Sequence, residues 1–141
     1  PIAGWLMRLA RDIELERGDS RSAGAAMEKC KERLDQRVSV MIFPEGTRSA
    51  TGELGKFKDG AFRLAIEAGV PILPLAVHGT RTALRKNDRR YGRSVAEVRV
   101  LEPVSTEGMT LEDVPELRER VRDLIAEQVS QMSGDRELTD A

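Results

Sequence analysis

A carboxylate, a hydroxyl and a guanidinium follow one apolar stretch of this 141-residue chain within a few positions. The apolar residues 38–43 end at a proline, and a short polar turn comes next: Glu45, Gly46, Thr47 and Arg48. A short apolar run bounded by a proline predicts a buried strand that ends there. Because ligands of open α/β sheets bind beyond the carboxyl ends of the strands, the turn lies where a binding site forms. The alternative is a capped turn whose charged side chains are simply solvated.

Three cations are expected to meet at this edge. Arg17, Arg48 and Lys58 each lie at or just beyond the end of a predicted strand, and βα turns bring such ends to the same side of a sheet. Charge-assisted hydrogen bonds are about twice as strong as neutral ones, so converging cations suit a phosphate monoester. Taken singly, each arginine is better explained by a surface salt bridge worth less than about 1 kcal/mol.

The elements around these residues predict an α/β fold. Residues 12–17 alternate apolar and polar positions as a half-buried strand does, and a helix with apolar residues at spacings of three and four extends to about residue 36. The strand expected over 38–43 follows. A strand, a helix and a strand connected in this way predict parallel pairing, hence a mostly parallel central sheet flanked by helices.

The rest of the chain continues one domain, residues 1–141. We expect a helix over 2–9, a helix over 59–68 capped by Asp59 and ended by Gly69, a strand over 70–77 made irregular by its two prolines, an edge strand over 95–101, and a long amphipathic helix from about 114 to 132. Residues 133–141 are polar, and we expect a frayed tail there.

Composition limits the partners. The formal net charge is −1, and we expect no nucleic-acid partner. Six basic residues nevertheless gather in 81–93 against one acid (Arg81, Arg85, Lys86, Arg89, Arg90 and Arg93). That segment is either a solvated loop or a contact for phosphate or an anionic membrane surface, where each cation contributes about 1 kcal/mol. The single cysteine, Cys30, excludes an intramolecular disulfide and is expected in the core. The sequence contains no signal peptide and no apolar run of about 18 residues, so we do not expect these residues to span a bilayer.

Residues 43–48, Phe-Pro-Glu-Gly-Thr-Arg, resemble the F-P-E-G-T-R motif of the glycerolipid acyltransferases that act on lysophosphatidic acid. Three further segments resemble that family in the same order: 13–19 with its arginine, 56–62 with its lysine and glycine, and the proline-containing strand 70–77. The resemblance covers most of residues 1–101, and four ordered motifs are far more specific than any one of them.

The resemblance implies transfer of a fatty acyl group from coenzyme A or acyl-carrier protein to the free hydroxyl of lysophosphatidic acid, giving phosphatidic acid at the cytoplasmic face of a membrane. It implies no metal and no cofactor beyond that acyl thioester. The family's catalytic histidine and aspartate, in an N-H-x-x-x-x-D motif, are not found in this sequence. Its one histidine, His78, follows a strand and is expected to be structural. We therefore expect a domain that lacks its N-terminal part and is inactive by itself.

The resemblance assigns the acceptor's phosphate to Arg17, Arg48 and Lys58, with Gly46 and Thr47 beside it. For Glu45 two roles stay open. It accepts a hydrogen bond from a substrate hydroxyl, or it pairs with Arg48 or Lys58 and sets the shape of the loop. A carboxylate beside cations is a poor base, so we rank positioning above proton abstraction. The competing hypotheses are a non-catalytic module that binds anionic phospholipid headgroups, and a nucleotide enzyme. The latter is disfavoured because neither G-x-x-x-x-G-K-[ST] nor G-x-G-x-x-G occurs.

Overall fold

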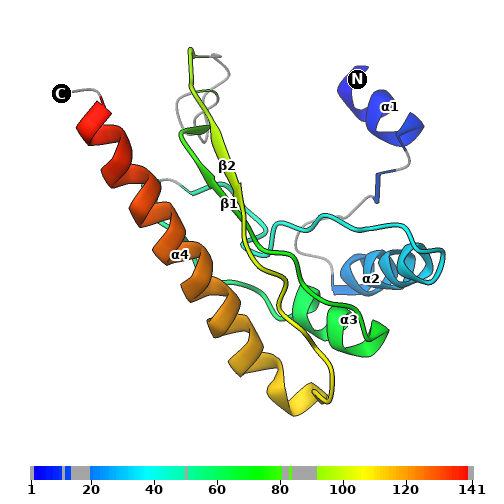
Figure 1. The fold of residues 1–141 in the computed structure, drawn as a ribbon. Coiled ribbons are helices and arrows are strands. Elements are labelled where there is room, and N and C mark those ends of the chain that lie inside the picture. The colour runs from blue at the N-terminus through cyan, green and yellow to red at the C-terminus, as the bar shows by residue number, and fades with distance from the viewer. Residues whose placement is uncertain are drawn as a thin grey trace. The chain divides into compact units, whose positions relative to one another are not determined.

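The computed structural model describes residues 2–10, 12–13, 20–49, 51–80, 83 and 92–139. These residues form a mixed α/β structure (Figure 1). The chain divides into two compact units, Pro1–Ile42 and Phe43–Ala141. Each unit is described by itself.

Two helices make up most of the first unit, α1 (Ile2–Leu9) and α2 (Ser20–Asp35). Both were predicted from sequence. The second helix ends in a Schellman-type turn, in which the amide of Val38 donates to the carbonyl of Arg33 at 2.9 Å. Arg37 takes the left-handed conformation with φ 59°, a position that glycine usually occupies. This turn fixes where the chain leaves the helix.

The segment after α2 differs from the prediction. Residues 38–43 form no strand, and no parallel pairing occurs among the described residues; residues 14–17 of the expected partner lie outside them. The side chains of Met41 and Phe43 remain 70% and 75% exposed. An interior strand needs a hydrogen-bonded neighbour, and the described residues provide none here. The strand predicted over 38–43 is therefore wrong for this structure.

A two-stranded antiparallel sheet lies in the second unit. Strand β1 (Leu75–His78) pairs with β2 (Glu97–Val100), from Leu75 opposite Val100 to His78 opposite Glu97. One isolated antiparallel bridge lies beyond this ladder, between Ile72, which precedes β1, and Val104, which follows β2. The strand predicted over 70–77 thus becomes regular only at residue 75, because Pro74 has no amide to donate. The edge strand predicted over 95–101 is confirmed in a shorter form.

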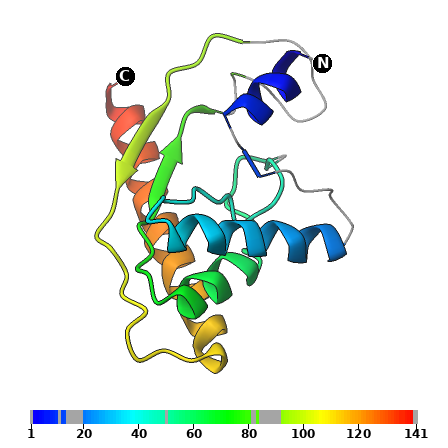
Figure 2. The same ribbon diagram turned by 90° about the vertical axis from the view of Figure 1, so that its right-hand side faces the viewer.

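Helix α4 (Val114–Thr139) packs against β1 (Figure 2). A short 3₁₀ turn, η2 (Leu111–Asp113), leads into it. The helix continues to Thr139, beyond the end expected near residue 132, and the frayed tail over 133–141 stays a prediction. Met132 is fully buried at the start of that segment. None of the helices in the described ranges is long and apolar enough to cross a membrane.

The core of the second unit joins α4 to a loop and to a short helix, α3 (Gly60–Ala68). Its buried members are Phe57, Phe62, Val104, Val114, Leu117 and Val121. The rings of Phe57 and Phe62 stack with centroids 6.2 Å apart. Since Phe57 precedes α3 and follows the polar turn, this stack anchors one end of the loop that carries the predicted site residues.

The ends of α3 agree with the sequence in one respect and differ in another. Gly69 ends the helix in the left-handed conformation (φ 61°), as predicted. Asp59 stands at the N-cap, but its side chain makes no capping bond. It pairs instead with Arg118 of α4 at 2.5 Å and raises the pKa of that guanidinium. The carboxylate therefore links α3 to α4.

Candidate functional site

The predicted motif forms a tight turn at the start of the second unit. The amide of Gly46 donates to the carbonyl of Phe43 at 3.0 Å. Gly46 adopts φ 66°, a left-handed conformation that opposes any side chain with a Cβ atom. The glycine of the motif is thus required by the backbone of the turn.

Residues 43–58 form one closed loop, called the 43–58 loop below. The amide of Lys58 donates to the carbonyl of Pro44 at 2.9 Å and joins the two ends. The amide of Gly55 donates to Oε2 of Glu45 at 2.8 Å, and these two residues are ten positions apart in the sequence. The buried ring of Phe57 fixes the same end in the core. These contacts hold the motif turn against the end of its own loop.

The ammonium of Lys58 lies directly over Gly46. A Cβ atom built on Gly46 would stand 2.9 Å from Nζ of Lys58 and 3.1 Å from its Cε. Only a glycine allows the lysine to come this close to the backbone. The structure therefore brings together two of the residues selected from sequence, and it gives the glycine a second reason besides its φ angle.

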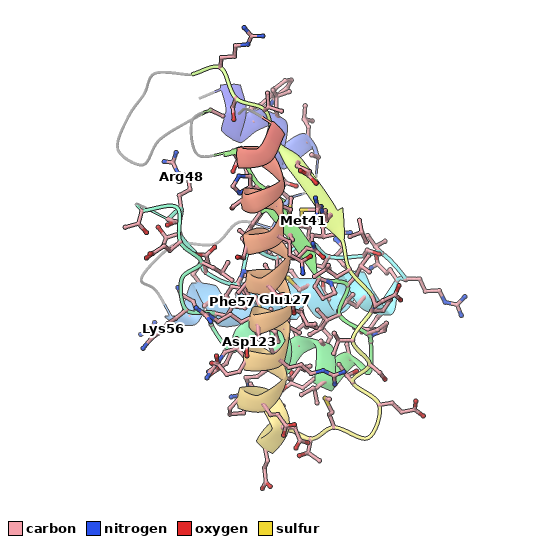
Figure 3. All side chains as sticks on the ribbon, turned by 60° about the vertical axis from the view of Figure 1, so that its left-hand side comes forward. Met41, Arg48, Lys56, Phe57, Asp123 and Glu127 are labelled. Atoms are coloured by element: carbon pink, nitrogen blue, oxygen red, sulfur yellow. The ribbon has the colours of Figure 1, made fainter. Side chains whose placement is uncertain are left out.

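Thr47 and Arg48 are exposed on the same turn. Figure 3 shows the side chains of Arg48 and Lys56 extending away from α4. Arg17, the third cation of the expected phosphate site, lies outside the described residues. The predicted meeting of the three cations therefore stays a prediction. The described residues show the contact of Lys58 with Gly46.

Glu45 has a structural partner. Its carboxylate accepts the amide of Gly55, and a Cβ atom on Gly55 would lie 2.8 Å from the same oxygen. Of the two roles left open by the sequence, shaping the loop is the one with a visible contact, although the partner is a backbone amide and not the cation that was expected. A contact with a substrate hydroxyl stays a prediction.

Sequence reasoning missed Gly55 and Arg122. Arg122 of α4 donates through Nε to the carbonyl of Gly55 at 3.2 Å and through Nη2 to that of Leu54 at 3.3 Å. These partners are 67 and 68 positions apart. No local pattern signals such a contact, since on the helix Arg122 looks like any other half-exposed charge.

His78 has a partner on α4. Its Nδ1 lies 3.3 Å from Oγ of Ser133, which also donates to the carbonyl of Val129 at 3.0 Å. This contact links the end of β1 to the last third of the helix and agrees with a structural role for the histidine. Across the described ranges, no group of three or more His, Cys, Asp or Glu side chains could hold a metal ion.

The described fold and loop define an α/β protein with a glycine turn that carries cationic side chains, the kind of arrangement that binds anions. The sequence profile of the Acyltransferase family matches residues 1–78, more than half of the chain. The chain belongs to the Acyltransferase family.

Particular relatives are similar over most of the chain. The human protein named 1-acyl-sn-glycerol-3-phosphate acyltransferase alpha is 43% identical over 121 residues, which are 85% of this chain and 43% of the human one. The 1-acyl-sn-glycerol-3-phosphate acyltransferase of Saccharomyces cerevisiae is 35% identical over 135 residues, 94% of this chain and 45% of the yeast protein. This chain thus spans somewhat less than half the length of these relatives.

A solved structure has the same fold. The crystal structure of the 1-acyl-sn-glycerophosphate (LPA) acyltransferase PlsC from Thermotoga maritima superposes with a TM-score of 0.78 at 28% sequence identity. The match covers 94% of this chain and 52% of that one. The likeness therefore extends beyond residues 1–78 into the sheet and α4.

Proposed function

We propose that this chain is the acceptor-binding part of a 1-acylglycerol-3-phosphate acyltransferase, which transfers a fatty acyl group to lysophosphatidic acid and forms phosphatidic acid. One observation carries the proposal: the ammonium of Lys58 is held against Gly46, beside Thr47 and Arg48 in the family's motif. The names of the human, yeast and Thermotoga relatives support the same activity.

The acceptor's phosphate would bind to the 43–58 loop. A phosphate monoester carries close to two negative charges at neutral pH and offers three oxygens to donors. Arg48 and Lys58 supply charge-assisted donors and Thr47 a hydroxyl, and we propose that Arg17 binds the same phosphate. Glu45 would contribute through the backbone of the loop, by holding Gly55.

Acyl transfer itself needs a base, and we propose that this is the histidine of an N-H-x-x-x-x-D motif, which is absent from these 141 residues. A neutral imidazole takes the proton of the attacking hydroxyl, and an aspartate holds the ring in the required tautomer. The acyl thioester of coenzyme A or acyl-carrier protein is the co-substrate, and no other cofactor is proposed. This chain by itself would bind the acceptor and not turn it over.

Two further parts of the proposal concern the surroundings of the loop. We propose that the fold is built on a mostly parallel central sheet flanked by helices, as the family resemblance implies, and the mixed α/β content of the described residues supports this. We also propose that the protein works at the cytoplasmic face of a membrane, where lysophosphatidic acid is found in the lipid surface. The basic segment 81–93 would favour an anionic surface.

The test is acyl transfer by the protein expressed from its complete reading frame. The acceptors are lysophosphatidic acid and a monoacylglycerol, which lacks the phosphate. Arg48→Ala should raise the KM for lysophosphatidic acid by about tenfold or more, as expected for loss of a charged hydrogen bond. It should leave the KM for the monoacylglycerol unchanged. Equal effects on both acceptors, or no effect, would reject the phosphate assignment.

The second candidate function is a module that binds anionic phospholipid headgroups without catalysis. It is favoured by the engagement of the only histidine, His78, with Ser133. Such a module would bind vesicles containing phosphatidic acid, and added salt would weaken the binding because exposed charges are screened. Acyl transfer by the complete protein would exclude this candidate, and vesicle binding that ignores anionic lipid and salt would exclude it as well.

A further inference from the structure

We propose that Arg122 of α4 is a positioning residue for the proposed acyl acceptor, acting through the 43–58 loop without touching the substrate. The inference rests on the proposed function, since it takes this loop as the phosphate-binding element. It adds a residue that lies far outside the four sequence motifs and outside residues 1–78, which match the family profile.

The guanidinium of Arg122 holds two consecutive carbonyls of the loop. Nε donates to Gly55 at 3.2 Å and Nη2 to Leu54 at 3.3 Å. The third nitrogen, Nη1, lies 3.6 Å from Oδ1 of Asp123, the next residue on the helix. Each nitrogen of the planar group thus has its own partner, and the fork geometry fixes the direction of the loop's backbone.

Gly55 is held from both sides. Its carbonyl accepts from Arg122, and its amide donates to the carboxylate of Glu45 at 2.8 Å. One residue without a side chain therefore connects an arginine on α4 to the glutamate of the motif turn. A Cβ atom there would stand 2.8 Å from the carboxylate oxygen, so a side chain at this position would displace the carboxylate of Glu45.

The helix supplies a fixed base for this contact. Leu117 and Val121 of α4 are buried in the core, and Leu54 packs against that core from the loop side. The side chain of Arg122 is only 31% exposed, so its donors are less hydrated than those of a fully exposed arginine. The contact thus transmits the position of a packed helix to an otherwise polar loop.

Loss of Arg122 should loosen the turn that carries the cations. Without the fork, the carbonyls of Leu54 and Gly55 turn to solvent, and the bond from Gly55 to Glu45 loses its support. Glu45 precedes Gly46, against which Lys58 lies. The expected effect is weaker binding of the acceptor, with the chemical step itself little changed.

The experiment compares Arg122→Ala and Arg122→Lys with Arg120→Ala in the protein expressed from its complete reading frame. Arg120 is an exposed arginine on the same helix, two positions earlier, and provides the matched control. The first readout is the hydrogen-exchange rate of the Gly55 amide by NMR. The second readout is steady-state kinetics, which gives the KM for lysophosphatidic acid and kcat separately.

Arg122→Ala should accelerate Gly55 exchange and raise the KM by about tenfold, since bonds from a charged donor are lost, while kcat changes less than about threefold. Arg122→Lys should restore part of both effects, because an ammonium can reach one carbonyl but not both. Arg120→Ala should change neither readout.

Unchanged Gly55 exchange in Arg122→Ala would overturn the contact, and an unchanged KM with faster exchange would overturn the positioning role. A fall in kcat with an unchanged KM would do the same. Failure of the proposed function gives a separate result: Arg48→Ala would then leave the KM unaltered, whatever Gly55 exchange shows.

Discussion

Replacing Gly46 by alanine tests the two physical demands that the motif turn makes on its glycine. The residue adopts φ 66°, and an added Cβ atom would stand 2.9 Å from Nζ of Lys58. Holding a side chain in the left-handed region costs about 1–2 kcal/mol. The overlap with Lys58 adds little to this cost, because the far end of a flexible side chain can move away. Gly46→Ala should therefore lower the free energy of unfolding by about 1–2 kcal/mol.

Function should suffer more than stability in this variant. For a chain of this length the stability loss corresponds to a fall in Tm of about 3–7 °C. Displacing the ammonium of Lys58 removes a charged donor from the proposed phosphate site, a contribution of about 1.5–3 kcal/mol. The KM for lysophosphatidic acid should then rise by about 10- to 100-fold. Thermal unfolding of this chain measures the first effect, and acyl-transfer kinetics of the protein expressed from its complete reading frame measure the second.

Gly69→Ala is the matched control. Gly69 adopts φ 61° at the end of α3, and a Cβ atom built there meets nothing within 4 Å. This variant should lose a similar free energy of unfolding and keep the KM of the parent protein. If Gly46→Ala left the KM unchanged, or if Gly69→Ala raised it equally, the reasoning about Lys58 would be refuted.

Three further predictions concern stability and reactivity. Leu117→Ala, at a side chain 1% exposed, should lower the free energy of unfolding by about 2–5 kcal/mol in a urea titration, and a loss below about 1 kcal/mol would contradict its place in the core. Burial raises the pKa of the Cys30 thiol, so alkylation by iodoacetamide at pH 8 should be much slower in the folded protein than in urea; equal rates would contradict this. The amide of Thr110 lowers the pKa of Asp113, so the stability from this carboxylate is present above its unfolded pKa of about 3.9 and is lost as the pH falls through the folded value. The difference in Tm between the parent and Asp113→Asn should therefore shrink below about pH 4, and a constant difference would contradict the capping box.

Local sequence signals predicted the helices and their ends well. The spacing of apolar residues located α1, α2 and α4, and a mostly apolar run located α3, which Gly69 ended because a left-handed residue at that point favours glycine. The limits of α4 were less accurate, since residues 133–139 are polar but continue the helix. There Met132 is buried and Ser133 contacts His78, and neither contact can be read from local polarity.

Pairing between strands was predicted less well. The apolar pattern of residues 38–43 is that of an interior strand, but a strand also depends on neighbours far away in the chain. The observed ladder joins β1 to β2, two segments separated by the basic stretch 81–93. Antiparallel pairing across such a distance leaves no local signature, whereas the two prolines correctly indicated that the strand predicted over 70–77 is irregular.

For the candidate site, the motif located the turn but not what holds it. Gly46 and Lys58 were selected from sequence and lie against each other. Arg122 and Gly55 were missed because their contact joins residues 67 positions apart. Asp59 was expected to cap α3, and it pairs with Arg118 because α4 packs close to that end of the helix. Long-range packing thus decided the details of the site.

Binding of glycerol 3-phosphate, measured by isothermal titration calorimetry, tests the central claim most directly. The complete protein is compared with its Arg48→Ala and Lys58→Ala variants, and glycerol serves as the ligand without phosphate. The account predicts that each substitution weakens binding of glycerol 3-phosphate by about tenfold or more, and that glycerol binds no better than background to any of the three proteins. Equal affinity of the three proteins for glycerol 3-phosphate would contradict the claim that the 43–58 loop binds the acceptor's phosphate.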